Sequence, residues 1–160
     1  MTISVGERVP DVPLFRMGDA GVEAISTATL FAGRMVVLFA VPGAFTPTCS
    51  AQHLPGFIEA ADALHARGVD EIACLSVNDA FVMEAWGRSA GSSGKVTMLA
   101  DGNGDFTRAL GLEIDARKNG LGMRSRRYSM VVEDGFVTHL NLDEPGAFKI
   151  SAASHLLEQL

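Results

Sequence analysis

The chain has no long hydrophobic run and an excess of acidic residues over basic ones. No apolar stretch in its 160 residues approaches the roughly 18 residues that a membrane-spanning helix needs, so we expect no contact with a membrane. The N-terminus has no basic segment followed by an apolar one, and we expect no signal peptide. Lys and Arg number 13 against 19 Asp and Glu, for a net charge of −6. Because phosphate binding needs clustered positive charge, this balance argues against nucleic acid as a partner.

Cysteine is also scarce, with only Cys49 and Cys74 in the chain. There is no Cys-x-x-Cys motif, which excludes a dithiol oxidoreductase of the thioredoxin kind. Hydrophobic residues make up 48% of the chain, enough for a core without disulfide staples. We therefore expect two free thiols in a reducing compartment, the cytoplasm, and hold a structural disulfide between them as the less favoured alternative.

Linkers, internal repeats and low-complexity tracts are absent, which predicts one domain over residues 1–160. Asp101, Asn103 and Asp105 imitate a calcium loop, but Phe106 and Leu112 stand where that loop needs Gly and Glu. The sequence thus predicts neither a metal site nor a cofactor.

Apolar periodicity and turn residues predict the order of the elements. Buried strands are expected over 35–41, 71–77 and 96–100, with helices over 47–66 and 80–90 between them. They are preceded by short strands within 3–25 and a short helix over 27–31. They are followed by a helix over 106–110, by strands over 128–133 and 136–142 with a tight turn between them, and by a helix over 151–160. Thr46 is expected to cap the helix over 47–66, and Pro55 to kink it. This order predicts an α/β fold with a mixed central sheet and helices on both faces, compatible with a thioredoxin-like arrangement that carries an N-terminal strand extension.

Cys49 is the first candidate for chemistry. It lies just beyond the strand over 35–41, at the first turn of the following helix, beside Thr46. A helix N-terminus favours an anion, and the thiolate is the nucleophilic form of cysteine. Its flanking Pro, Thr and Ser residues make this interpretation stronger than that of a small buried core residue. For Cys74, on the strand over 71–77, we favour an inert buried thiol over a resolving cysteine.

His53 and three arginines are secondary candidates. His53 follows Cys49 by four residues and shares its side of the helix. A Cys–His pair is typical of cysteine hydrolases, but these bring the histidine from a distant segment, so we interpret His53 as mainly structural. Arg124, Arg126 and Arg127 precede the strand over 128–133. We expect one of them to reach Cys49 and favour its thiolate, and the other two to be solvated.

The spacing Pro42-x-x-x-Thr46-x-x-Cys49 resembles the peroxidatic signature of the peroxiredoxins. The longer segments 42–50, 53–57, 73–82 and 127–132 resemble the peroxiredoxin 5 subfamily, also called type II or atypical, and the likeness runs from about residue 5 to the end of the chain. The resemblance implies a thioredoxin fold and a thiol-dependent peroxidase that reduces hydrogen peroxide and alkyl hydroperoxides.

The resemblance also implies roles for four residues. Cys49 would be the peroxidatic nucleophile that becomes a sulfenic acid, and Thr46 would hydrogen-bond the thiolate and the peroxide through its hydroxyl. Pro42 would shield the sulfur from water. Arg127, which matches the arginine before the Tyr-Ser-Met string, would favour the thiolate and polarise the O–O bond.

Some members of the family carry a resolving cysteine near the C-terminus, but residues 148–152 contain none here. This departure implies a one-cysteine cycle in which an external thiol, glutathione with glutaredoxin or thioredoxin, reduces Cys49. The family also implies a homodimer joined through loops near the site, for which exposed apolar residues such as Phe45, Phe81 or Leu121 would supply contacts.

Two other functions remain open at this point. In the first, the chain is a peroxide-sensing thiol protein in which Cys49 passes its oxidation to a partner. The second is a hydrolase that uses Cys49 and His53, and it is remote.

Overall fold

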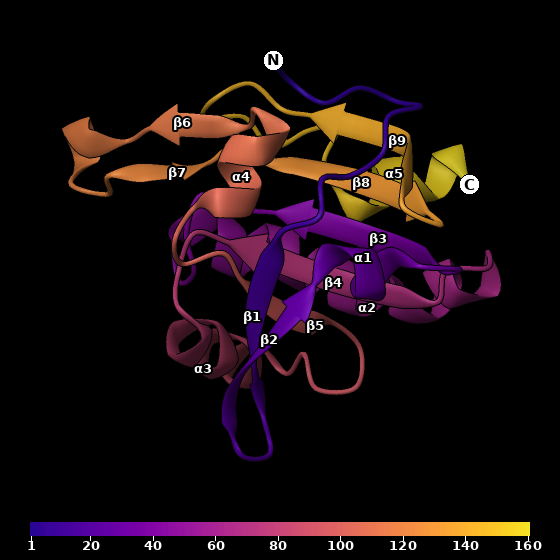
Figure 1. The fold of residues 1–160 in the computed structure, drawn as a ribbon, viewed down its shortest axis with the longest axis horizontal. Coiled ribbons are helices and arrows are strands. Elements are labelled where there is room, and N and C mark those ends of the chain that lie inside the picture. Colours follow the sequence, from indigo (N-terminus) through magenta and orange to yellow (C-terminus); the bar gives the residue numbers. More distant parts are fainter.

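The computed structural model describes residues 1–160 and contains a mixed seven-stranded sheet in the order β2-β1-β5-β4-β3-β8-β9 (Figure 1). Its strands are β1 (Pro13–Gly18), β2 (Gly21–Ser26), β3 (Met35–Ala40), β4 (Glu71–Ser76), β5 (Thr97–Ala100), β8 (Tyr128–Glu133) and β9 (Phe136–Leu142). Strands β3, β4 and β5 are parallel, whereas β8 joins β3 and β1 joins β5 in antiparallel pairs. This confirms the predicted α/β, thioredoxin-like fold, in which the β1–β2 hairpin is the N-terminal extension.

The helices cover both faces of the sheet and enclose two hydrophobic cores. One core contains residues of α2 (Leu54–Ala66), α3 (Ala80–Ala90) and α5 (Ala153–Gln159), and the other contains residues of α1 (Thr27–Phe31) and α4 (Asp105–Leu110). Strand β3 contributes to both, because Val37 and Phe39 face the first core and Val36 and Leu38 the second. A central strand buried on both faces explains why residues 35–41 are apolar without alternation. None of the helices is long and apolar enough to cross a bilayer.

Local turn and cap chemistry is confirmed at several of the predicted ends. The Asp79 side chain accepts a hydrogen bond from the Val82 N–H at 2.8 Å at the start of α3, and Gly91 ends that helix with a φ of 74°. Asp134 and Gly135 both have positive φ, at 48° and 84°, as a tight turn of the I′ type between β8 and β9 requires.

The helix predicted over 47–66 is interrupted in its first turns. Residues Cys49–His53 form a π-helix, η1, in which the Leu54 N–H bonds to the Cys49 carbonyl. Pro55 lies in the first turn of α2, where a missing N–H is tolerated, and the π-helical turn directly precedes it. The predicted side-chain cap is wrong: the Thr46 hydroxyl donates to the Gly43 carbonyl at 2.7 Å instead.

A small second sheet between α4 and β8 was not predicted from the sequence. Strands β6 (Glu113–Asp115) and β7 (Met123–Ser125) pair in antiparallel fashion, and the 3-10 helix η2 (Arg117–Asn119) lies in the connection between them. Figure 1 shows this hairpin projecting from the body of the molecule, at the upper left. Strands of three residues are too short for an alternating pattern to reveal them.

Candidate active site

Cys49 lies at the carboxyl end of β3 as the first residue of η1, and its side chain is fully buried. Arg127, the residue directly before β8, reaches it with Nη2 3.1 Å from the Cys49 Sγ. The register of the sheet explains this approach: Ala40, the last residue of β3, pairs with Tyr128, which brings Arg127 beside the segment that leads to Cys49. Of the three candidate arginines, Arg127 is thus the one that contacts the sulfur.

His53 also belongs to the site and is fully buried. Its Nδ1 is 2.8 Å from Arg127 Nη1, and its Nε2 is 3.0 Å from the Ser151 carbonyl oxygen. Burial first, and the Arg127 cation second, lower the pKa of His53 to about 3, so the ring is neutral at neutral pH. The spacing in the sequence placed His53 on the Cys49 side, but its contact with Arg127, 74 residues away, left no signal there.

The loop before Cys49 is held by hydrogen bonds of its own. Thr46 is half-buried, and its hydroxyl bond goes to Gly43 rather than to Cys49. Phe45, which lies between Gly43 and Thr46, has a φ of 65°, in the left-handed region that aromatic residues seldom adopt. Behind this loop, the indole N–H of the buried Trp86 in α3 donates to the Ser50 hydroxyl at 3.0 Å, which anchors η1 to α3.

Pro42 lines a small cavity of about 110 Å³ that also exposes Arg127. The other residues around this cavity are Thr48, Ile114, Arg126, Asp143, Glu144, Pro145, Gly146 and Ala147. The space is small, and its charged lining residues are two arginines, Arg126 and Arg127, and two acids, Asp143 and Glu144, which suits a compact polar molecule.

The expectation that two of the three arginines are solvated is wrong. Arg124 and Arg126 are half-buried and bind backbone carbonyls. Arg124 donates to Leu121 O at 2.8 Å and to Pro42 O at 3.3 Å, and Arg126 donates to Asp143 O at 3.3 Å. Loops with many unpaired carbonyls recruit guanidinium donors, and these two side chains tie the loops around the site together.

Comparison with known proteins decides the family. The Redoxin family model matches residues 4–157. The chain is 56% identical to Peroxiredoxin-2E-2, chloroplastic, of Oryza sativa subsp. japonica over 99% of this chain and 73% of that protein. It is 48% identical to Peroxiredoxin-2B of Arabidopsis thaliana, over 99% of this chain and 98% of the relative.

The chain is a type II peroxiredoxin. It is therefore a thiol peroxidase, as the resemblance predicts. The crystal structure of reduced Prx3 in complex with H2O2 from Vibrio vulnificus superimposes on it with a TM-score of 0.96 at 49% identity, covering 99% of both chains.

The second cysteine of this peroxiredoxin, Cys74, lies in β4 and is fully buried. It pairs across the sheet with Phe39, and both cysteines are free. Burial raises the pKa of the Cys74 thiol well above its usual value, with the neighbouring Cys49 acting in the same direction. A protonated thiol held in a sheet is a poor nucleophile, which agrees with the inert role expected of Cys74.

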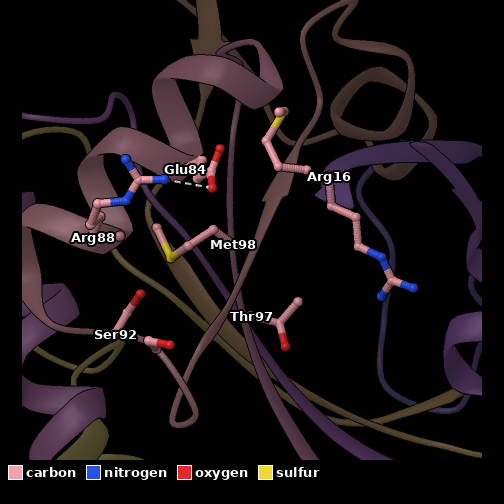
Figure 2. Close-up of a pocket in the computed structure, with 9 residues that line it drawn as sticks. Arg16, Glu84, Arg88, Ser92, Thr97 and Met98 are labelled. Carbon is pink, nitrogen blue, oxygen red and sulfur yellow. Dashed lines mark hydrogen bonds and ion pairs between the residues drawn. The ribbon is translucent and has the colours of Figure 1, made fainter. Parts of the chain in front are cut away.

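A larger cavity, of about 420 Å³, lies away from this site between α3, β1 and β5 (Figure 2). Its charged residues are already paired: Arg88 bonds Glu84 at 2.8 Å, and Arg16 bonds Glu23 at 2.7 Å. Figure 2 shows the Arg16 guanidinium on the opposite side of this cavity from the Arg88–Glu84 pair. No cysteine or histidine lines this cavity.

Proposed function

We propose that this peroxiredoxin reduces hydrogen peroxide and small alkyl hydroperoxides through Cys49 alone, and that an external thiol restores it. The observation that carries the proposal is the Arg127 guanidinium 3.1 Å from the Cys49 sulfur. A fixed cation and hydrogen-bond donor at that distance favours a thiolate over a thiol.

In the first step, the Cys49 thiolate attacks one peroxide oxygen, so that an S–O bond forms as the O–O bond breaks. Cys49 is oxidised by two electrons to a sulfenic acid, and the leaving oxygen takes a proton and departs as water or an alcohol. Negative charge grows on the leaving oxygen in the transition state, and Arg127 is the donor nearest to the sulfur that can stabilise it. Pro42, on the wall of the small cavity, limits the access of water to the sulfur.

In the second step, an external thiol attacks the sulfenic sulfur and releases water, which leaves a mixed disulfide on Cys49. A second thiol then reduces this disulfide and frees the thiolate. Two observations support an external thiol: Cys74 is sealed in the sheet, and residues 148–152 contain no cysteine. Glutathione with glutaredoxin, or thioredoxin, has the required chemistry, and a reducing cytoplasm supplies both.

The test is hydrogen peroxide consumption with glutathione and glutaredoxin, and separately with thioredoxin, by the wild type, Cys49→Ser and Cys74→Ser. We expect Cys49→Ser to be inactive and Cys74→Ser to turn over at close to the wild-type rate. Loss of turnover in Cys74→Ser together with a Cys49–Cys74 disulfide in the oxidised wild type would refute the one-cysteine cycle. Consumption of a single equivalent by the wild type would instead favour the peroxide sensor.

We also propose that the protein is a homodimer joined beside this site. Phe81, at the start of α3, and Phe45, in the loop before Cys49, have exposed fractions of 65% and 53%. The two lie close to the same helix, because the Phe45 ring is 6.4 Å from that of Trp86 in α3. Exposed aromatic residues near one element are typical of a protein–protein interface.

A further inference from the structure

Both ring nitrogens of His53 are bound to groups from distant parts of the chain. Nδ1 lies 2.8 Å from Arg127 Nη1, and Nε2 lies 3.0 Å from the Ser151 carbonyl oxygen. A carbonyl oxygen only accepts, so Nε2 must carry the proton; a guanidinium only donates, so Nδ1 must be the bare nitrogen. The two contacts together permit a single neutral tautomer of His53.

We propose that His53 is a positioning residue for Arg127, and that the Ser151 carbonyl fixes the tautomer in which it acts. His53 holds one guanidinium nitrogen of Arg127, so that the other faces the Cys49 sulfur at 3.1 Å. Two contacts define the orientation of a planar guanidinium far better than one does. The proposal rests on the role proposed above for Arg127 and adds the reason why that side chain points at the sulfur.

The surroundings of His53 keep its ring neutral and fixed in place. Phe39, Phe57 and Phe148 surround it, with ring centroids 4.9, 5.6 and 5.0 Å from that of His53. These aromatic rings exclude water, and the charged groups near it are the Arg127 cation and, opposing it, the Asp143 carboxylate. A ring that does not charge at cellular pH is a permanent acceptor for Arg127.

Asp143 holds the segment that presents the Ser151 carbonyl. Its carboxylate accepts hydrogen bonds from the backbone N–H groups of Lys149, Ile150 and Ser151, at 2.9, 3.0 and 3.1 Å, and from the Ser151 hydroxyl. Burial raises the pKa of this carboxyl, but the Ser151 hydroxyl and the three backbone donors together outweigh it and lower the pKa. An ionised Asp143 thus organises residues 149–151 around itself.

These contacts form one continuous chain from Asp143 through residues 149–151, His53 and Arg127 to Cys49. The covalent backbone of residues 149–151 joins the donors that Asp143 holds to the Ser151 carbonyl, and the remaining links are hydrogen bonds whose donors and acceptors are fixed by chemistry. The loop before α5, which contributes no reacting atom, therefore takes part in orienting Arg127.

The first test reads the tautomer directly and does not depend on activity. In nitrogen-15 NMR spectra of the reduced wild type, each histidine nitrogen reports whether it carries a proton, and His53→Asn identifies the His53 signals among the four histidines of the chain. We expect a protonated Nε2 and a bare Nδ1 from about pH 6 to about pH 8. A proton on Nδ1, a mixture of tautomers or a cationic ring in this range would overturn the proposal.

The second test replaces His53 with three side chains and measures the rate of reaction with hydrogen peroxide together with the ultraviolet absorbance of the thiolate against pH. Phe keeps the ring packing and removes both hydrogen bonds. Asn offers an oxygen near the position of Nδ1, whereas Gln reaches only the position of Nε2. We expect His53→Phe and His53→Gln to react about 10- to 100-fold more slowly and to form the thiolate at higher pH, whereas His53→Asn stays within about fivefold of the wild type.

Two results would contradict a positioning role for His53. In the first, His53→Phe reacts within about twofold of the wild type. In the second, the rates of the three His53 variants follow their melting temperatures, and His53→Asn, which keeps an acceptor near the position of Nδ1, is no faster than the other two for its stability. If Arg127→Gln, which removes the charge, also reacts at the wild-type rate, the proposed role of Arg127 itself fails. If the His53 tautomer is the expected one and Arg127→Lys is slow, but His53→Phe is fast, the positioning role of His53 fails and the proposed role of Arg127 stands.

Asp101 supplies a matched control for the Asp143 carboxylate that holds residues 149–151. Asp101 is a buried carboxylate that accepts bonds from the Phe106 and Thr107 N–H groups and from the Thr107 hydroxyl, among residues of the other core. We expect Asp143→Asn to slow the peroxide reaction about tenfold and to disturb the His53 signals, and Asp101→Asn to lower the melting temperature alone. Equal effects of the two variants on the rate would show that Asp143 contributes only stability.

Discussion

Thr46 has one hydroxyl proton and can therefore donate only one hydrogen bond through its side chain. The hydroxyl donates to the Gly43 carbonyl at 2.7 Å, so while that bond stands Thr46 cannot also donate to the Cys49 thiolate. Its oxygen keeps two lone pairs, which are free to accept a hydrogen bond from the O–H of a bound peroxide. We therefore propose that Thr46 acts in this protein as an acceptor that orients the peroxide, and not as a donor to the thiolate.

We predict that Thr46→Val slows the reaction with hydrogen peroxide by about 100-fold, because the methyl group that replaces the hydroxyl cannot accept from the peroxide. Thr46→Ser keeps the oxygen and should remain within about fivefold of the wild type. Stopped-flow measurement of the peroxide reaction under single-turnover conditions distinguishes the two. Equal rates for Thr46→Val and the wild type would remove Thr46 from the mechanism.

Arg127 uses two of its nitrogens on two partners, and a lysine cannot do the same. Nη2 lies 3.1 Å from Cys49 and Nη1 lies 2.8 Å from His53, whereas an ammonium is a single point of charge on a flexible stem. We predict that Arg127→Lys lowers the rate constant for hydrogen peroxide by about 100- to 1000-fold while the protein stays folded.

The matched control for this substitution is Arg34→Lys. Arg34 binds the Leu30 carbonyl and Glu71, and neither group belongs to the site. Its substitution should leave the rate within about twofold of the wild type. A full rate in Arg127→Lys would mean that charge alone, without the orientation of the guanidinium, suffices at this site.

At the scale of the elements, most of the fold is predictable from the sequence, for reasons that are local. The strand over 35–41 is apolar because both of its faces are buried. Asp134 and Gly135 supply the two positive φ angles of the turn between β8 and β9. The caps at Asp79 and Gly91 act within a few residues of their own positions. In each case the residues that determine the structure are neighbours in the sequence.

The parts that could not be predicted depend on contacts between distant segments. The choice of Arg127 among three arginines follows from the pairing of β8 with β3, and only the family resemblance indicated it beforehand. The contact of His53 with Arg127 spans 74 residues, and its contact with Ser151 spans 98. The π-helix at Cys49 likewise depends on packing, since Pro55 alone predicts a kink but not its form.

Element η1 also makes the fold sensitive to acid. His53 has a pKa of about 3 in the folded protein, because of burial and of Arg127, against about 6.5 when unfolded. Below about pH 6.5 the unfolded chain binds a proton that the folded chain does not, so the contribution of His53 is complete above that pH and is lost as the pH falls toward 3.

We predict that the free energy of unfolding of the reduced wild type falls by about 2 kcal/mol through this group between about pH 7.5 and about pH 5. In His53→Asn, which has no titrating ring at this position, that part of the loss should be absent. Urea unfolding of the two proteins at both pH values provides the measurement. An equal loss in both would show that His53 is not buried in its neutral form.

At the scale of the whole molecule, the two cores bury the large apolar residues of both sheet faces, and few are left outside. Of the exposed aromatic side chains, Phe136 is covered by Arg8, whose guanidinium carbon lies 4.3 Å from the centre of its ring. Phe45 and Phe81 have no such cover, and both lie next to α3. Arg124 also binds both Leu121 O and Pro42 O, which places the half-buried Leu121 near the loop that carries Phe45.

An interface formed on this side of the molecule would cover the rim of the peroxide site, so association and catalysis would be linked through the loop at residues 42–48. We predict that the wild type sediments as a dimer at micromolar concentration and that Phe81→Asp sediments as a monomer, because a charge at the centre of an apolar contact is costly to bury. Val22→Asp is the matched control: Val22 is exposed to 45% on β2, the edge strand of the sheet, and its substitution should leave the dimer intact.

A monomeric wild type would contradict the proposed interface. A dimer that survives Phe81→Asp but is lost in Val22→Asp would move the interface to the sheet edge, where it could not order the loop at the active site.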